Sequence, residues 1–425
     1  MAVGVSGGAD SMALLLLVRA WAAARPDTAR AGMIALTVDH ALRRGSADEA
    51  DQVASWCAAI GVAHEILVWH HDEPVVSHVQ ERARAARYRL LTERCQALEI
   101  DALLVAHHGD DQAETVLMRL CKGSGVDGLA GMSDDQTLWT RQARPIRLLR
   151  PLLSYTHADL LGYCKAQGQT WIEDPSNHNP RFARSRLRAA REVLEAEGLS
   201  NANLLRLAHR AAIAARSLDQ IARAALEKYA EVTPFGEVRF PSDILHLATE
   251  EVSLRILAKA IDWASRPERP VPRESLEALR DDLISRRDSA PDRTLSGCLV
   301  RMRRGFVDLA REPAAIDDHA ILEPGERLLW DRRFLVTYPA KTGPESLTVR
   351  PLGQISAAVW DRVSIIPQDM PAPRSRASLP GLWRDTQLVA VPQIVTSIES
   401  ISRIRGPTAR FLWDADPMDF ADPDG

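Results

Sequence analysis

Residues 3–17 read VGVSGGADSMALLLL, and this run predicts the fold of the first part of the chain. The apolar residues 2–5 are typical of a short buried strand, and the apolar positions within 12–17 favour a buried helix. The turn between them consists of Ser6, Gly7, Gly8, Ala9, Asp10 and Ser11. A strand, a glycine-rich turn and a helix in this order form an anion cradle, because glycines admit a close ligand and the helix N-terminus favours phosphate.

Asp10 indicates which kind of phosphate site this is. A carboxylate repels phosphate oxygens unless a cation lies between them, so we expect Asp10 to hold Mg²⁺. A Walker loop would end in Gly-Lys-Ser or Gly-Lys-Thr, whereas the first lysine of the chain is Lys122. The turn is therefore predicted to grip pyrophosphate and not to transfer a γ-phosphoryl group. The alternative is an ordinary tight turn between a strand and a helix.

The hexapeptide at residues 6–11 resembles the S-G-G-x-D-S signature of the PP-loop ATP pyrophosphatases. This resemblance implies an ATP-binding domain that activates a substrate oxygen as an adenylate, after which a nucleophile displaces AMP.

Composition restricts the class of protein. The 425 residues are enough for two or three domains, and 46% apolar with 26% charged residues is typical of a globular protein. No apolar run is long enough for a membrane span, and the N-terminus does not resemble a signal peptide. The five cysteines form no CxxC pair, which indicates a reducing compartment and no cysteine-bound metal. We therefore expect a cytoplasmic enzyme that does not bind membranes.

Polar clusters follow three predicted strands. Asp39 and His40 end the apolar run 33–38, and HHGDD at 107–111 follows the run 101–106, as SGGADS follows the first strand. Because strands here alternate with predicted helices, we expect a doubly wound parallel sheet whose carboxyl edge gathers all three clusters. The other predicted elements are a strand at 62–68 and helices at 80–97 and 111–122. A further helix is predicted to start at Ser46, with Ser46 as N-cap and Glu49 completing a capping box.

The character of the sequence changes near residue 200. Helices rich in Ala, Leu and Arg are predicted at 201–229, 244–263 and 273–285, whereas strands are predicted after residue 312, including a hairpin at 328–338. The expected domains are therefore 1–200, the ATP-binding catalytic domain; 201–311, a helical domain for binding or linkage; and 312–425, a small β-containing C-terminal α/β domain.

Three acids follow the paired histidines: Asp110, Asp111 and Glu114. Near a bound triphosphate they are suited to holding Mg²⁺ or a cationic substrate. A zinc or di-metal hydrolase is the rival hypothesis, but it leaves SGGADS unexplained. Helix capping by Asp110 or Asp111 is the simplest structural interpretation.

Arginines cluster in two places. Arg84 and Arg87 lie at helical spacing, where either a solvated face or a ligand contact explains them. Residues 181–191 contain five arginines and no acid, which favours RNA binding through phosphates.

Several further motifs narrow the resemblance. VDHALRRGSADEADQVASWCAAIGV, QERARAARYRLL, AHHGDDQAETVLMRLCKGSGVDGLAGM, RPLL at 150–153 and WIEDPSN at 171–177 occur in one order, and together they resemble the tRNA(Ile)-lysidine synthetases over residues 1–190. VRPLG at 349–353 and ASLPGLW at 377–383 are more loosely similar to the C-terminal domain of that family. The resemblance implies adenylation of C2 of the wobble cytidine in the isoleucine tRNA with a CAU anticodon. The amine of free L-lysine then displaces AMP and forms lysidine.

The resemblance also implies roles for individual residues. It places Asp39 and His40 at the adenine edge of ATP, and Asp111 and Glu114 on lysine or metal, so the predicted catalytic residues are Asp10, Asp111 and Glu114. The residues that it assigns to the nucleotide or the tRNA are Arg84, Arg87, Arg150, Asn177, Arg184 and Arg188. The implied cofactors are ATP and Mg²⁺, and a homodimer stays open.

The chain departs from the family pattern in two places, and two alternative functions remain. Ser185 stands where the family usually has Asn, and Met1 falls inside the first strand, so either the start lies upstream or the sheet is weakened. A tRNA thiolase is a weaker match because those enzymes commonly use a CxxC pair. A non-catalytic binder would not need both SGGADS and HHGDDQAE.

Overall fold

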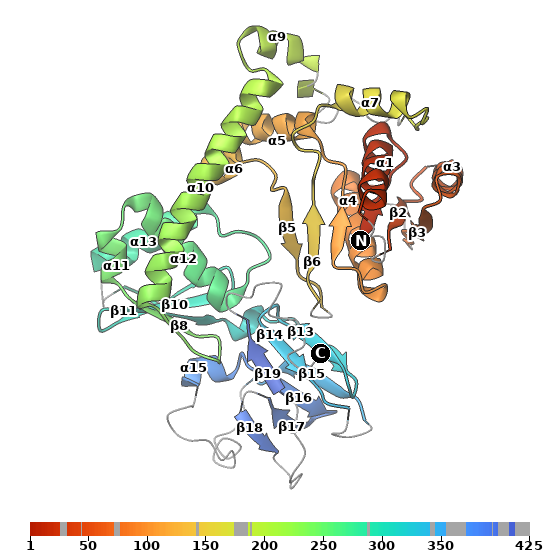
Figure 1. Cartoon of the computed structure of the whole chain (residues 1–425). Coiled ribbons are helices and arrows are strands. Elements are labelled where there is room, and N and C mark those ends of the chain that lie inside the picture. The colour runs from red at the N-terminus through yellow and green to blue at the C-terminus, as the bar shows by residue number, and fades with distance from the viewer. Residues whose placement is uncertain are drawn as a thin grey trace. The chain divides into compact units, whose positions relative to one another are not determined.

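The structure is a computed structural model, and it describes residues 1–25, 32–43, 45–71, 77–141, 144–173, 186–187, 189–286, 290–340, 345–353, 371–392, 394–397 and 408–412. The chain divides into two compact units: residues 1–140 with 144–215, and residues 141–143 with 216–425 (Figure 1). Among these described residues, no helix is long and apolar enough to cross a membrane.

The first unit is built on a six-stranded sheet in which the N-terminal strand is central. All neighbouring strands pair in parallel except the antiparallel edge strand β5. In spatial order the strands are β3 (Ala63–Val68), β2 (Ile34–Asp39), β1 (Ala2–Gly4), β4 (Ala102–Leu104), β6 (Ile146–Leu149) and β5 (Asp135–Leu138). The helices of this unit are α1 (Ala9–Ala23), α3 (Ser46–Ala59), α4 (Val79–Ala97), α5 (Gly109–Cys121), α6 (Val126–Leu129), α7 (His157–Ala166), α9 (Arg191–Ala196) and the first part of α10 (Asn201–Tyr229).

Both faces of the sheet are covered, which explains the apolar runs in its strands. Successive residues of a strand point to opposite faces. Val3 and Leu104 pack with α1, α3 and α7 in one core, whereas Ala2 and Leu103 pack with α4 in another. The predicted doubly wound sheet is therefore confirmed.

The start of α3 corrects one prediction. Ser46 is not the N-cap; Gly45 is, with a left-handed φ of 88° and no capping side chain. Glu49 forms an ion pair with Arg43, with Oε1 2.7 Å from Arg43 NH1, in place of the capping box. The glycine takes the cap position because it adopts that backbone angle at no steric cost.

The second unit begins with helices packed on a sheet. The predicted helix at 201–229 is α10, the predicted helix at 273–285 is α13 (Arg273–Arg286), and the stretch 244–263 is split into α11 (Asp243–Leu247) and α12 (Glu250–Ser265). They share one apolar core with a five-stranded antiparallel sheet that the sequence analysis did not anticipate. Its order is β7 (Glu231–Val232), β8 (Val238–Pro241), β11 (Phe306–Arg311), β10 (Cys298–Arg303) and β9 (Arg293–Leu295).

The remainder of this unit consists mainly of strands. The predicted hairpin at 328–338 is formed by β13 (Arg327–Trp330) and β14 (Phe334–Thr337), which pair in antiparallel fashion. A second core joins this hairpin to the last five-stranded sheet. The remaining elements are η3 (Pro313–Ala315), β12 (Ala320–Leu322), β15 (Leu347–Pro351), α15 (Pro373–Arg376), β16 (Pro380–Arg384), β17 (Gln387–Val391), β18 (Ile394–Ser397) and β19 (Thr408–Phe411). The three-domain division stays a prediction.

Candidate functional site

The turn between β1 and α1 has a shape that requires glycine. Gly7 has a φ of +86°, and a Cβ there would lie 2.7 Å from Cδ1 of Ile172 and 2.9 Å from Cγ2 of Val53. The carbonyl of Gly7 accepts a hydrogen bond from the backbone N–H of Ile172 at 2.9 Å. A side chain is excluded by both the backbone angle and the close approach.

Serine hydroxyls fix the rest of the turn. Ser11 Oγ donates to the carbonyl of Gly8 at 2.8 Å and accepts from the backbone N–H of Ser6 at 3.2 Å. Gly8 is the N-cap of α1 and offers no capping side chain. The first turn of α1 therefore presents N–H groups without a side-chain cap, which is the arrangement that binds phosphate.

A pocket of about 180 Å³, partly open to solvent, lies beside the turn. Arg84 and Arg87 of α4 contribute to its wall, so these two predicted arginines lie beside the glycine-rich turn and not on a purely solvated face. We call it the loop pocket, and its lining is Gly4, Val5, Ser6, Gly8, Asp10, Ser11, Leu36, Val38, Arg84, Arg87, Tyr88, Leu91, Val105, Ala106 and His107.

Asp39 and His40 lie at the carboxyl end of β2 but are not among the described residues that line the loop pocket. Asp39 Oδ1 accepts from the backbone N–H of Ala41 at 2.8 Å. Arg87 NH2 lies 3.2 Å from His40 Nε2, and because a guanidinium only donates, Nε2 accepts. Burial, with a smaller contribution from Arg87, lowers the pKa of His40 to about 4, so this ring is neutral at pH 7.

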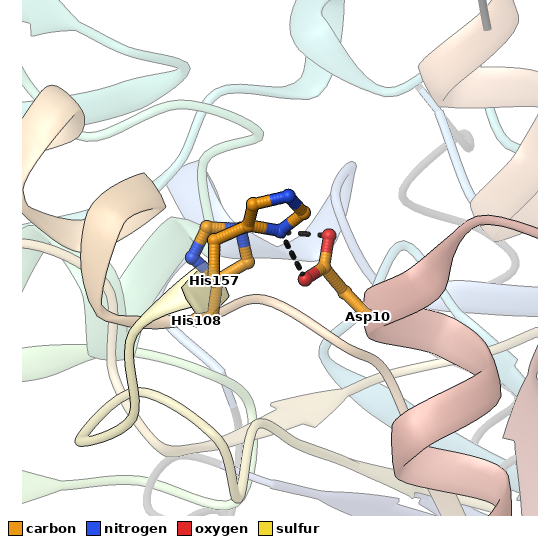
Figure 2. Close-up of side chains that lie close together, drawn as sticks. All are labelled: Asp10, His108 and His157. Carbon is orange, nitrogen blue, oxygen red and sulfur yellow. Dashed lines mark hydrogen bonds and ion pairs between the residues drawn. The ribbon is translucent and has the colours of Figure 1, made fainter. Parts of the chain in front are cut away.

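Three side chains from separate segments lie close together around Asp10, which lines the loop pocket (Figure 2). Asp10 lies in the first turn of α1, His108 precedes α5, and His157 is the first residue of α7. His157 Nδ1 is 2.7 Å from Asp10 Oδ1, and His108 Nε2 is 3.6 Å from Asp10 Oδ2. Both oxygens of one carboxylate thus face imidazole nitrogens.

His108 also caps α5, which corrects the expectation that Asp110 or Asp111 would be the cap. His108 Nδ1 accepts from the backbone N–H of Asp110 at 3.2 Å, and the Asp111 carboxylate accepts from the backbone N–H of His108 at 3.3 Å. The two bonds form a capping box in which histidine replaces the usual hydroxyl residue. Asp111 is its acidic partner.

The three predicted acids face two different places. Asp111 Oδ2 lies 3.5 Å from His108 Nε2, on the side of Asp10. Asp110 and Glu114 instead line a second, smaller pocket, which we call the acidic pocket. Its lining is Asp110, Ala113, Glu114, Leu117, Leu187, Arg191, Leu194, Leu199, Asn201 and Leu204.

The Asp110 carboxylate of the acidic pocket has polar contacts through both of its oxygens. One oxygen accepts from the backbone N–H of His157 at 2.8 Å. The other oxygen accepts from the side-chain amide of Asn201 and lies 3.9 Å from NH2 of Arg191. The Asp110 carboxylate therefore joins the acidic pocket to the start of α7.

Arg150 has a position different from the one expected for a tRNA contact. Its side chain is buried, and its guanidinium donates to the carbonyl of Ser133 at 2.7 Å and to Gln136 Oε1 at 3.0 Å. It holds the strand β5 beside β6, and its contact with tRNA stays a prediction without support from this position. Asn177, Arg184 and Arg188 lie outside the described residues.

The oxygen donors beside the glycine-rich turn fit Mg²⁺. This ion takes one or two carboxylates and completes its shell with phosphate oxygens and water. Each Asp10 oxygen has a lone pair beyond the one that faces a histidine. Asp10 is therefore suited to be the protein ligand of a Mg²⁺ ion bound with ATP.

The sequence did not indicate His157, Asn201 or the position of Arg191 in a pocket. Arg191 was visible only as one of five clustered arginines. His157 and Asn201 had no local signal, because their partners Asp10 and Asp110 are 147 and 91 residues away.

Comparison with known proteins identifies the class first. The family model for the PP-loop domain matches residues 1–196, the part of the chain that contains the sheet and both pockets apart from two lining residues of α10 and Leu199. The chain contains a PP-loop domain, as the hexapeptide at residues 6–11 indicates.

Curated relatives identify the family more closely. A tRNA(Ile)-lysidine synthase from Wolbachia pipientis wMel is 32% identical, and the match covers 93% of this chain and 88% of the relative. The tRNA(Ile)-lysidine synthase from Methylobacterium sp. (strain 4-46) is 41% identical, over 73% of this chain and 88% of the relative. The one from Ruegeria pomeroyi is 32% identical, over 92% of this chain and 88% of the relative. The chain belongs to the tRNA(Ile)-lysidine synthase family. Among solved structures, the U34-tRNA thiolase NcsA from Methanococcus maripaludis is 19% identical at a TM-score of 0.40, over 49% of this chain and 70% of its own, too little to bear on function.

Proposed function

We propose that this protein uses ATP to join free lysine to C2 of the wobble cytidine of the isoleucine tRNA with a CAU anticodon. The products are lysidine in the tRNA, AMP and pyrophosphate. The observation that supports this most is the pairing of a phosphate-binding loop pocket with an acidic pocket through Asp110 and His157. One pocket suits a nucleotide and the other suits a cationic nucleophile.

In the first half-reaction, ATP lies in the loop pocket. The O2 oxygen of the cytidine attacks the α-phosphorus, the bond between the α-phosphorus and the bridging oxygen breaks, and pyrophosphate leaves. The N–H groups at the start of α1, together with Arg84 and Arg87, stabilise the charge on the phosphates. Asp10 would hold Mg²⁺, which would supply neutralisation of phosphate charge at this site.

In the second half-reaction, an amine of lysine attacks C2 of the adenylated base. The new C–N bond forms, the C2–O bond breaks, AMP leaves with the bonding pair, and the amine loses a proton. Glu114 and Asp110 suit the ammonium groups of lysine, and Arg191 suits its carboxylate. Leu117, Leu194 and Leu204 provide an apolar wall for the methylene chain.

The tRNA contacts of the proposal come from the sequence and the family. Arg84 and Arg87 line the loop pocket, and we expect them to contact ATP or the cytidine. Arg184 and Arg188 belong to the arginine-rich run 181–191, which favours phosphate contacts, and Asn177 precedes this run. A cytoplasmic location and a homodimer stay predictions.

Incorporation of labelled lysine into tRNA tests the function. With the isoleucine CAU tRNA, ATP and Mg²⁺, we expect acid-stable label in the RNA, and none with the same tRNA carrying uridine at the wobble position. Asp10→Ala should abolish AMP formation and leave tRNA binding nearly unchanged. The proposal is overturned if no lysine is incorporated while pyrophosphate is released on another substrate.

A further inference from the structure

The Asp10 carboxylate is held by more than its own helix. Its side chain retains 28% exposure, so it is accessible to a ligand of the loop pocket. His157 Nδ1 lies 2.7 Å from Asp10 Oδ1, the shorter of the two histidine contacts with this carboxylate. A carboxylate at neutral pH only accepts hydrogen bonds, so Nδ1 of His157 carries the donated proton.

His157 is itself fixed in place by the start of α7. Thr156 is the N-cap, and its hydroxyl and the Asp159 carboxylate form a capping box. The backbone N–H of His157 donates to Asp110 Oδ2 at 2.8 Å. The imidazole therefore extends from an anchored backbone toward the glycine-rich turn.

The same three side chains have the spacing of a metal site, because their ligand atoms lie within 4.8 Å of one another. The hydrogen bonds of His108 argue against that use. Its Nδ1 accepts the backbone N–H of Asp110, so the proton of the neutral ring is on Nε2, the atom that faces Asp10. A protonated Nε2 has no lone pair for a metal ion.

We infer that His157 is a positioning residue for Asp10, whereas His108 Nε2, at 3.6 Å from Asp10 Oδ2, lies beyond hydrogen-bond distance. By donating to one carboxylate oxygen, His157 fixes the direction in which Asp10 presents its free lone pairs to a divalent cation in the loop pocket. This inference rests on the proposed function only for the identity of the ligand, Mg²⁺ with ATP. Outer partners that orient a metal-binding carboxylate strengthen its affinity for the metal.

Two substitutions at one position separate positioning from other roles. His157→Ala removes the donor. His157→Asn keeps an N–H donor at the place of Nδ1 but offers no imidazole nitrogen to a metal. Tyr155→Ala is the matched control, because Tyr155 is 53% exposed in the same segment before α7 and lines neither pocket.

The measurement is the binding of a fluorescent ATP analogue to the full chain during Mg²⁺ titration, and again in EDTA. We expect His157→Ala to raise the half-saturating Mg²⁺ concentration about 10- to 100-fold, the usual effect of losing such a partner. His157→Asn and Tyr155→Ala should match the wild type, and all four proteins should bind the analogue equally in EDTA. Melting temperatures check that each variant is folded.

Three results would overturn the inference. They are an unchanged Mg²⁺ requirement in His157→Ala, an equal loss in His157→Asn, or about one zinc ion per purified chain that both variants lose. Because the readout is binding of ATP and Mg²⁺, it does not depend on lysine incorporation. A failed lysidine assay would therefore overturn the proposed function without deciding the role of His157.

Discussion

At the scale of single residues, the acids after the paired histidines have different surroundings although they are close in sequence. Asp111 completes the cap of α5 and faces His108 beside Asp10, whereas Glu114 lines the acidic pocket. The two residues should therefore affect different half-reactions. This separation is visible only in three dimensions, since both belong to the same helix.

Glu114→Gln should raise the KM for lysine about 10- to 100-fold, because a hydrogen bond to a charged group contributes about 1.5–3 kcal/mol. Formation of the adenylated tRNA should stay near the wild-type rate. Asp111→Asn should slow adenylation and leave the KM for lysine unchanged. Rates of the two half-reactions, measured with and without lysine, check this.

Glu192→Gln is a suitable control, because Glu192 is exposed on α9 and lines neither pocket among the described residues. If Glu114→Gln and Asp111→Asn impair both half-reactions equally, the acids act as one site and the separation into two pockets is wrong.

The sequence indicated the turn residues and the acids, because both form compact motifs with a physical reason for their spacing. It did not indicate His157, whose partner is 147 residues away and whose own neighbourhood reads as a helix start. It also did not indicate that histidine would cap α5. Contacts of this range depend on how helices pack, and short motifs in the sequence do not indicate helix packing.

At the scale of elements, the turn from β1 to α1 is tightly constrained by its first glycine. Gly7 has a left-handed backbone and no room for a Cβ, whereas Gly8 is extended, with φ of −71° and the nearest atom 3.8 Å from its built Cβ. Backbone angle and packing therefore require glycine at position 7 but not at position 8.

Gly7→Ala should lower the free energy of unfolding of the first unit by about 2–4 kcal/mol through backbone strain and contact with Ile172 and Val53. Gly8→Ala should cost less than about 1 kcal/mol, because its backbone angle suits any residue. Its Cβ should instead weaken ATP binding, since Gly8 lines the loop pocket. Urea unfolding and ATP titration of both variants separate the effects, and equal destabilisation would contradict this account.

Buried parallel strands were predictable because they are apolar on both faces, as Ala35 and Leu36 are. The sheet within residues 231–311 was not anticipated, although in β10 buried residues alternate with partly or fully exposed ones. Its hairpin to β11 turns at Arg304 and Gly305, both with positive φ. Arginine does not indicate such a turn, which usually has Asn, Asp or Gly at that position. Short strands between long helices are easily hidden by the helical signal.

At the scale of the whole molecule, the second unit contains a buried charge cluster of its own. Asp331 accepts from Arg311 at 2.9 and 3.0 Å and from Arg333 Nε at 2.6 Å. Arg333 is fully buried, and burial lowers its pKa to about 10. One carboxylate therefore compensates two guanidinium groups inside this unit.

Asp331→Asn should destabilise the second unit by about 3–5 kcal/mol, because it leaves buried charges without their partner. Asparagine tolerates the left-handed φ of 46° at this position, so the loss is electrostatic and not conformational. Asp385→Asn is the matched control, since Asp385 has a similar φ of 52° but is exposed.

Calorimetry of the full chain can assign the loss to one unit. ATP with Mg²⁺ should raise the transition of the first unit by mass action, and Asp331→Asn should lower the other transition. A shift in the ATP-responsive transition, or none at all, would contradict the assignment.

The central claim is that the loop pocket transfers AMP to a tRNA base and does not transfer a γ-phosphoryl group. The direct test incubates the protein with ATP labelled at the α-phosphate and the isoleucine CAU tRNA in the absence of lysine. We predict label on the tRNA, released as AMP when lysine is added. Formation of ADP, or AMP release without labelled tRNA, would contradict the claim.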